Sequence, residues 1–271
     1  MKNVYSIVIL VILVSHFAAC EKIVDLNLES AEPKIVIDAS ITEGEPCTVI
    51  LTKSQPFTDN SPFKRISGAT IRLSTPGRYT ETLQERYEEP GVYISQMKGV
   101  VGRTYKLEVL VEDNVYEASS TIPQKVYIND LFIYEIRLGD GSWYSPCIAF
   151  DDPPEESNYY YTIVSVNSKI LNSYYLTDDE NRNGKLIERI LYYNKEDNDD
   201  EDLKIGDQID VVLQTLDKGM YTYYKSLFSI AANGGTNPIT NISGGALGCF
   251  KAYNPSYMSI SIDWSHVRSN K

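Results

Sequence analysis

Apolar and polar residues alternate, position by position, through several short stretches of this chain. Between residues 34 and 41 every second residue is apolar, and the same period of two recurs at 69–73 and 105–111. Successive side chains of a β-strand point to opposite faces, so this period is typical of strands with one buried face. The chain is therefore predicted to be mainly β.

Turn-forming residues separate these stretches at short intervals. They are Glu43-Gly44-Glu45-Pro46, Pro76-Gly77, Pro90-Gly91 and Asp113-Asn114. Short strands at this spacing, with no helical stretch between them, predict a β-sandwich. We place this sandwich domain at residues 31–124, closing at Ile122-Pro123.

The second half, residues 125–271, is predicted to be a β-rich domain with one packed helix. Its expected strands are 127–136, 159–166, 187–193, 208–216, 246–252 and a final alternating stretch at 258–264. The helix is expected near 218–232, with Asp217 as its N-cap and Tyr221, Tyr224 and Phe228 at helical spacing. Asn233-Gly234-Gly235 supplies the stop signal.

The first nineteen residues have the features of a cleaved leader. Lys2 gives a positive start, residues 7–14 are an unbroken apolar run, and small residues Ala18 and Ala19 precede Cys20. The run is too short to span a bilayer, and the ending resembles a bacterial lipobox, although Phe17 replaces the usual Leu. We predict a signal peptide at 1–19, lipidation of Cys20 and a tether at 20–30. Ordinary secretion with an incidental cysteine is the alternative.

The net charge limits the kinds of partner. It is −12, and it becomes −13 when Lys2 leaves with the leader. Binding to nucleic acid and electrostatic binding to anionic lipids both need a basic surface, so neither is expected. Membrane attachment would come from the lipid on Cys20. Acidic Glu21 and Asp25 beside it favour the outer membrane, at the cell surface or else on the periplasmic face.

Three cysteines remain after Cys20, namely Cys47, Cys147 and Cys249. An odd, widely spaced set is no disulfide framework, although one pair could bridge, and no CxxC pair suggests zinc. We interpret all three as buried apolar residues.

An ordered set of segments resembles a known lipoprotein family. The segments are Cys20-Glu21-Lys22, 32–36, 66–71, 90–93, 102–107, 221–228 and 244–250. In this order they resemble a Bacteroidota family catalogued as domain of unknown function 4249, over nearly the whole mature chain. The resemblance implies an Ig-like or prealbumin-like sandwich in the first half. It also implies a gene neighbourhood shared with TonB-dependent outer-membrane transporters.

Catalytic motifs are missing from the sequence. His266 is the one histidine left after the leader, and no Gly-x-Ser-x-Gly or His-Glu-x-x-His pattern accompanies it. Carboxylate pairs such as Asp151-Asp152 are interpreted as loop residues. We therefore name no catalytic residue and expect no enzyme activity.

The acidic stretch at 178–202 has two interpretations at its start. Asp179, Asn181 and Asn183, followed by Gly184, fit the opening of a calcium loop, but Ile190 stands where a bidentate Glu is needed. Asn183-Gly184 between apolar runs is also a hairpin signal, which we favour.

Pairs of aromatic residues suggest a binding face. They are Trp143-Tyr144, Tyr159-Tyr160-Tyr161, Tyr174-Tyr175 and Tyr192-Tyr193, in a chain with 21 tyrosines. Strand neighbours point to opposite sides, so at most half of each group could share a face for a glycan or peptide. Core packing is the favoured interpretation.

Three functions follow, in order of preference. The first is an accessory or ligand-binding lipoprotein of a TonB-dependent transporter. The second is a free-standing surface binder of glycans or peptides, and the third is a secreted hydrolase. The ligand-binding residues are unknown from sequence.

Overall fold

The computed structural model describes residues 32–56, 58–77, 79–139, 141–235 and 237–269. Within them the chain is mainly β, as predicted, with three sheets and one α-helix. Two short 3₁₀-helices, η1 (Lys195–Asn198) and η2 (Trp264–His266), complete it. In these residues no helix is long and apolar enough to cross a membrane. The predicted leader, Cys20 and the tether lie outside the described residues.

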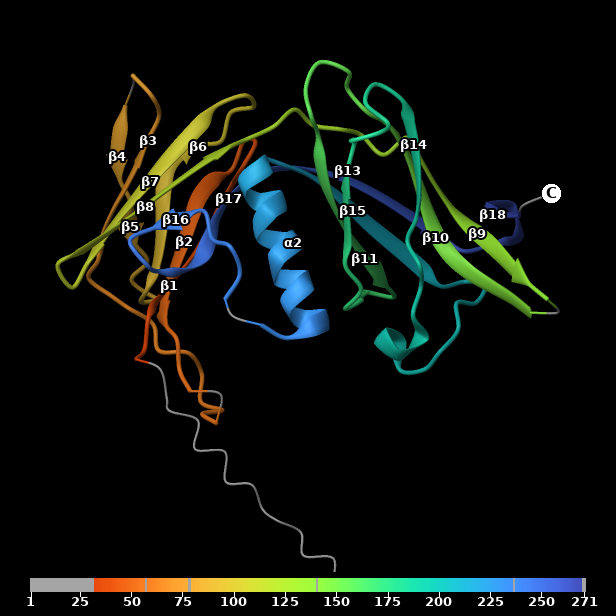
Figure 1. Ribbon diagram of the computed structural model, residues 1–271, viewed down its shortest axis with the longest axis horizontal. Coiled ribbons are helices and arrows are strands. Elements are labelled where there is room, and N and C mark those ends of the chain that lie inside the picture. The colour runs from red at the N-terminus through yellow and green to blue at the C-terminus, as the bar shows by residue number, and fades with distance from the viewer. Residues whose placement is uncertain (1–31, 57, 78, 140, 236, 270–271) are drawn as a thin grey trace, which may run out of the picture. The chain divides into compact units, whose positions relative to one another are not determined.

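The largest sheet has nine strands, which come from both halves of the chain, between Ile35 and Ser261 (Figure 1). In pairing order it contains β12 (Lys169–Ile170), β11 (Tyr159–Val166), β15 (Gln208–Leu216), β17 (Leu247–Ser261), β1 (Ile35–Thr42), β2 (Pro46–Lys53), β6 (Val92–Lys98) and β5 (Gln84–Glu85), with β13 (Tyr175–Asp178) paired to β11. Strand β17 is the link, because it runs parallel to β1 at one end and antiparallel to β15 at the other.

Two smaller sheets pack on the large one. The five-stranded sheet contains β16 (Ile242–Ser243), β8 (Asn114–Thr121), β7 (Thr104–Val111), β3 (Thr70–Ser74) and β4 (Thr80–Thr82). The four-stranded sheet contains β14 (Leu186–Ile190), β10 (Gly141–Asp151), β9 (Asp130–Leu138) and β18 (Val267–Ser269).

Each smaller sheet encloses a hydrophobic core. The first core lies between the five-stranded sheet and β1, β2 and β6, and the alternating residues of β1 and β7 point into it as predicted. The second lies between the four-stranded sheet and β11 and β15. Ile122 belongs to the first core, and Val126, four residues later, belongs to the second. The expected domain boundary at residue 124 therefore falls between the two cores. Whether each half folds as its own domain stays a prediction.

The helix α2 (Lys218–Asn233) forms where the sequence predicts it. Asp217 caps it by accepting a hydrogen bond from the backbone N–H of Met220, and Gly234 ends it in a positive-φ conformation. Figure 1 shows α2 beside β11, β13 and β17, whose residues it contacts.

Two local predictions were wrong. Asn183-Gly184 is no hairpin turn, because β13 before it pairs with β11 while β14 after it pairs with β10, in different sheets. The two closing strands are one strand, β17, that continues through Pro255. Pro255 lies past the end of the β1 pairing at Tyr253, where an edge tolerates a missing N–H.

Candidate functional site

The start of β10 and the chain that follows β14 enclose a groove of about 560 Å³. The groove is lined by Gly141, Ser142, Trp143, Tyr144, Tyr193, Asn194, Lys195, Asp202 and Leu203. Tyr144 packs against the second core, whereas neighbouring Trp143 is 53% exposed. Both residues line the groove, and Tyr144 is the one of the two that packs inward.

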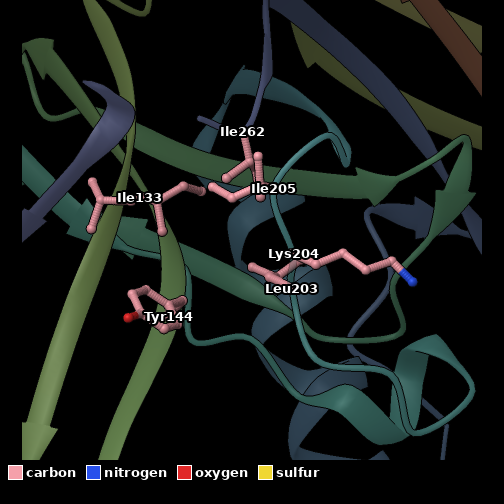
Figure 2. A pocket seen from close by; sticks show the side chains of 7 residues that line it. Ile133, Tyr144, Leu203, Lys204, Ile205 and Ile262 are labelled. Atoms are coloured by element: carbon pink, nitrogen blue, oxygen red, sulfur yellow. The ribbon is translucent and has the colours of Figure 1, made fainter. Parts of the chain in front are cut away.

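An apolar pocket of about 150 Å³ adjoins this groove (Figure 2). It is lined by Ile133 of β9, Tyr144, Leu203, Lys204, Ile205, Ile262 and Val267. Tyr144 and Leu203 belong to both hollows, so they form the wall that the two share. Figure 2 shows the isoleucines gathered around the pocket and the Lys204 side chain extending away from them.

The groove's wall at Tyr193 is held by hydrogen bonds at each end of that residue. Its backbone N–H donates to Ser145 Oγ at 3.1 Å, and its hydroxyl donates to the carbonyl of Glu201 at 2.5 Å. The same hydroxyl accepts from Asn198 Nδ2 at 2.9 Å. Burial raises the pKa of Tyr193, which keeps its hydroxyl a neutral donor. This wall is therefore formed before any ligand arrives.

The pocket's wall at residues 203–205 is held by the buried Asp207. Its carboxylate accepts from the backbone N–H of Lys204 and from Asn167 Nδ2, both at 3.0 Å. Gly206, with φ of 94°, allows the tight turn between them. These contacts hold Ile205 over the pocket although its side chain is 49% exposed.

Charged groups at the groove are of both signs. Lys195 and Asp202 line it, and the Lys204 ammonium forms an ion pair with Glu201 at 2.8 Å. The lining residues include neither His nor Cys. The arrangement can accept hydrogen-bonding groups along the groove and an apolar group in the pocket, which is the chemistry of binding.

The aromatic groups predicted from sequence divide between faces as the alternation requires. Tyr144 and Tyr193 reach the groove, while Tyr160 and Tyr175 are buried in the second core. Trp143 and Tyr192 are exposed.

Tyr159, Tyr161 and Tyr174 pack under α2 instead. Tyr159 lies 4.8 Å from Tyr221 between ring centroids, Tyr161 stacks on Tyr224 at 4.7 Å, and Tyr174 stacks on Phe228 at 4.1 Å. These rings pack between helix and sheet, whereas core and cross-strand packing was the favoured prediction.

The residues of the predicted calcium loop differ in burial. Asp179 is buried and its carboxylate accepts from the backbone N–H of Asn158 at 2.9 Å, while Asn181 and Asn183 are exposed. In the described residues no cluster of three or more His, Cys, Asp or Glu side chains suits a metal. Calcium binding stays a prediction, and a melting temperature unchanged by millimolar calcium would remove it.

The three cysteines present in the described residues are free. Burial raises the pKa of each thiol to about 12, which makes Cys47, Cys147 and Cys249 unreactive near neutral pH. His266 contacts Asp263 at 3.3 Å near the end of the chain, away from the groove lining.

Sequence patterns indicate only part of this groove. Tyr144 and Tyr193 belong to the aromatic pairs that suggest a binding face. No sequence pattern predicted that Ile133, Leu203, Ile205 and Ile262 would line a pocket. Leu203 and Ile205 follow an acidic run, and their apolar character there was the available signal.

Fold and site together define a mainly β protein of stacked sheets with a groove of ligand size. The chain matches the family described as "Domain of unknown function (DUF4249)" over residues 21–257, and it belongs to that family. No curated protein matches it. Among solved structures, a chain of "Cytokine receptor complex - Crystal form 1A" is 8% identical, with a TM-score of 0.30 over 84% of this chain and 98% of that one. That likeness carries no argument about fold or function.

Proposed function

We propose that this protein is a lipid-anchored, non-enzymatic binding protein that holds its ligand in the groove beside Tyr144 and Tyr193. The observation that supports this most is the junction of the groove with the apolar pocket. Together they offer hydrogen-bonding and apolar surfaces side by side, within the size range of ligand sites.

The rigidity of both walls also favours binding. Tyr193 and Asp207 each make hydrogen bonds that fix the segment between β14 and β15. A site that is already ordered loses less conformational entropy when a ligand binds, which raises affinity.

Cys20 would place this groove at a membrane. Its two or three acyl chains would hold the protein stably, because each buried methylene contributes about 0.8 kcal/mol. We propose the outer membrane as the site of attachment, facing outward.

A TonB-dependent transporter is the partner we propose, because the family resemblance implies neighbouring genes. In this role the protein would present a captured ligand to the channel. A free-standing surface binder of glycans or peptides would use the same groove without the transporter.

Affinity purification of a C-terminally tagged protein from detergent-solubilised native membranes separates these roles. Recovery of a TonB-dependent transporter in near-equal amount is the expected result. Recovery of the protein alone, still in the membrane fraction, would contradict the partnership and favour the free-standing binder. Turnover of a glycan or peptide by the purified protein would contradict the non-enzymatic role.

A further inference from the structure

We infer that the ligand is a short neutral or basic peptide that inserts one leucine- or phenylalanine-sized side chain into the apolar pocket. This inference rests on the proposed binding function of the groove and names the class of ligand.

The size and the lining of the pocket determine which side chain of the ligand can enter it. A protein cavity of roughly 150 Å³ lined by aliphatic residues accommodates benzene. This pocket has about 150 Å³ and is lined by Tyr144 and by five branched aliphatic side chains, from Ile133, Leu203, Ile205, Ile262 and Val267. A phenyl or isobutyl group therefore fits it in both volume and polarity.

The same lining disfavours a sugar ring in the pocket. Hydroxyls surround the rim of a hexose ring, so a hexose enclosed in this pocket would bury several of them, and a hydroxyl buried without a hydrogen-bond partner is costly. The one charged lining residue, Lys204, directs its ammonium to Glu201 and away from the isoleucines (Figure 2). An unsubstituted glycan would leave the pocket empty.

The groove's polar groups suit the peptide backbone next to that side chain. Ser142, Asn194 and Asp202 lie along the groove, on the other side of the wall made by Tyr144 and Leu203. Amide groups of a peptide can donate to and accept from such side chains, while the ring of Tyr144 covers an adjacent apolar part of the chain.

The charge beside the groove predicts the charge of the peptide residues that flank the inserted side chain. The segment from Glu196 to Asp202 carries six acidic residues, against Lys195 before it and Lys204 after it. Of these acids Asp202 lines the groove and Asp199 pairs with Lys169, so six negative charges against three positive ones leave the segment beside the groove negative. A basic or neutral peptide is attracted here, and an acidic one is repelled.

Calorimetric titration of the soluble mature protein with matched peptides tests the inference. The probes are acetyl-KSXSK-amide peptides in which X is Leu, Phe, Ala or Asp. Burying the larger side chain should make the Leu and Phe peptides bind roughly 10- to 100-fold more tightly than the Ala peptide. An acidic counterpart, acetyl-ESLSE-amide, should bind more weakly than the Leu peptide.

Two variants test whether the affinity difference between the Leu and Ala peptides arises in the pocket. Ile205→Trp fills the pocket from its mouth and should bring the Leu and Ala peptides to equal affinity. Ile239→Trp is the matched control, since Ile239 is 62% exposed in the loop after α2 and should leave the difference intact. Circular dichroism verifies that both fold. If Ile205→Trp does not fold, Ile205→Ala replaces it and should lower the affinity for the Leu peptide.

The outcomes separate this inference from the function it rests on. Equal affinities for the Leu and Ala peptides, or an unchanged difference in Ile205→Trp, would overturn the inference. Binding of an unsubstituted oligosaccharide, lost in Ser142→Trp, with no binding of the Leu peptide would overturn it too, while the binding function stands. Binding of neither class across peptide and glycan arrays would contradict both.

Discussion

The carboxylate of Asp207 accepts a hydrogen bond from the backbone N–H of Lys204 at 3.0 Å, and so fixes the turn that carries Leu203 and Ile205. Both of these apolar side chains line the pocket. Asp207 is not a lining residue, yet its hydrogen bond to Lys204 fixes the positions of residues that are.

Replacing Asp207 should weaken both the fold and the site. Asp207→Ala removes two hydrogen bonds to a buried carboxylate, and we expect a loss of about 2–4 kcal/mol in the free energy of unfolding. Urea denaturation measures this loss, and peptide titration below the transition should show reduced affinity. Glu196→Ala, an exposed acid of the same segment, is the control and should change stability by less than about 0.5 kcal/mol. Equal effects of the two variants would contradict the role of Asp207.

Asp217 should be the most sensitive residue of α2. One of its carboxylate oxygens caps the helix by accepting from the backbone N–H of Met220. The other oxygen accepts from Ser120 Oγ at 2.5 Å and from the backbone N–H of Thr121 at 2.9 Å, so Asp217 links the helix to β8. We expect Asp217→Ala to cost about 2–3 kcal/mol, more than an ordinary cap. Lys218→Ala, one residue on and exposed, should be nearly neutral. A loss from Asp217→Ala below about 0.5 kcal/mol in urea denaturation would refute this tie.

Alkaline pH should destabilise the protein through its buried tyrosines. Burial raises the pKa of Tyr223 to about 12, whereas an unfolded tyrosine ionises near about 10. Above that lower value the unfolded chain binds fewer protons than the folded one, so stability falls as pH rises. The melting temperature should therefore drop as pH rises past about 10.

Two phenylalanine variants test whether Tyr223 causes this fall in the melting temperature. Tyr223→Phe removes one of the ionising groups and should make the drop shallower. Tyr87→Phe changes a tyrosine that is 98% exposed and should leave the pH profile unaltered. A profile that is the same in all three proteins would show that Tyr223 is not responsible.

Cys20→Ala should release the protein from the membrane. The prediction follows from the leader and the lipobox-like residues that precede Cys20. Cell fractionation with immunoblotting measures it, and Cys249→Ala should stay in the membrane fraction. Membrane retention of Cys20→Ala would contradict lipid anchoring at this residue.

Sequence predicted α2 well because its signals are local. Asp217 caps the helix through Met220, three residues on, and Gly234 ends it, so neither depends on distant parts of the chain. The strand β15 (Gln208–Leu216) was likewise predicted to its ends from its apolar pattern.

Pairing and the groove depend on distant parts of the chain. The turn at Asn183-Gly184 has hairpin chemistry, but the strands beside it find partners in two different sheets. The pocket joins Ile133 and Ile262, which are far apart in sequence and meet through the second core. No local pattern indicates which apolar residues of different strands will leave a hollow between them.

The most direct test of the account is an NMR titration of isoleucine methyl groups in the mature protein. The probe is the acetyl-KSLSK-amide peptide. We predict that the methyl signals of Ile133, Ile205 and Ile262 shift with the Leu peptide, while those of exposed Ile170 and Ile239 stay in place. Binding that shifts other isoleucines and leaves these three unchanged would contradict the assignment of the groove and its pocket as the ligand site.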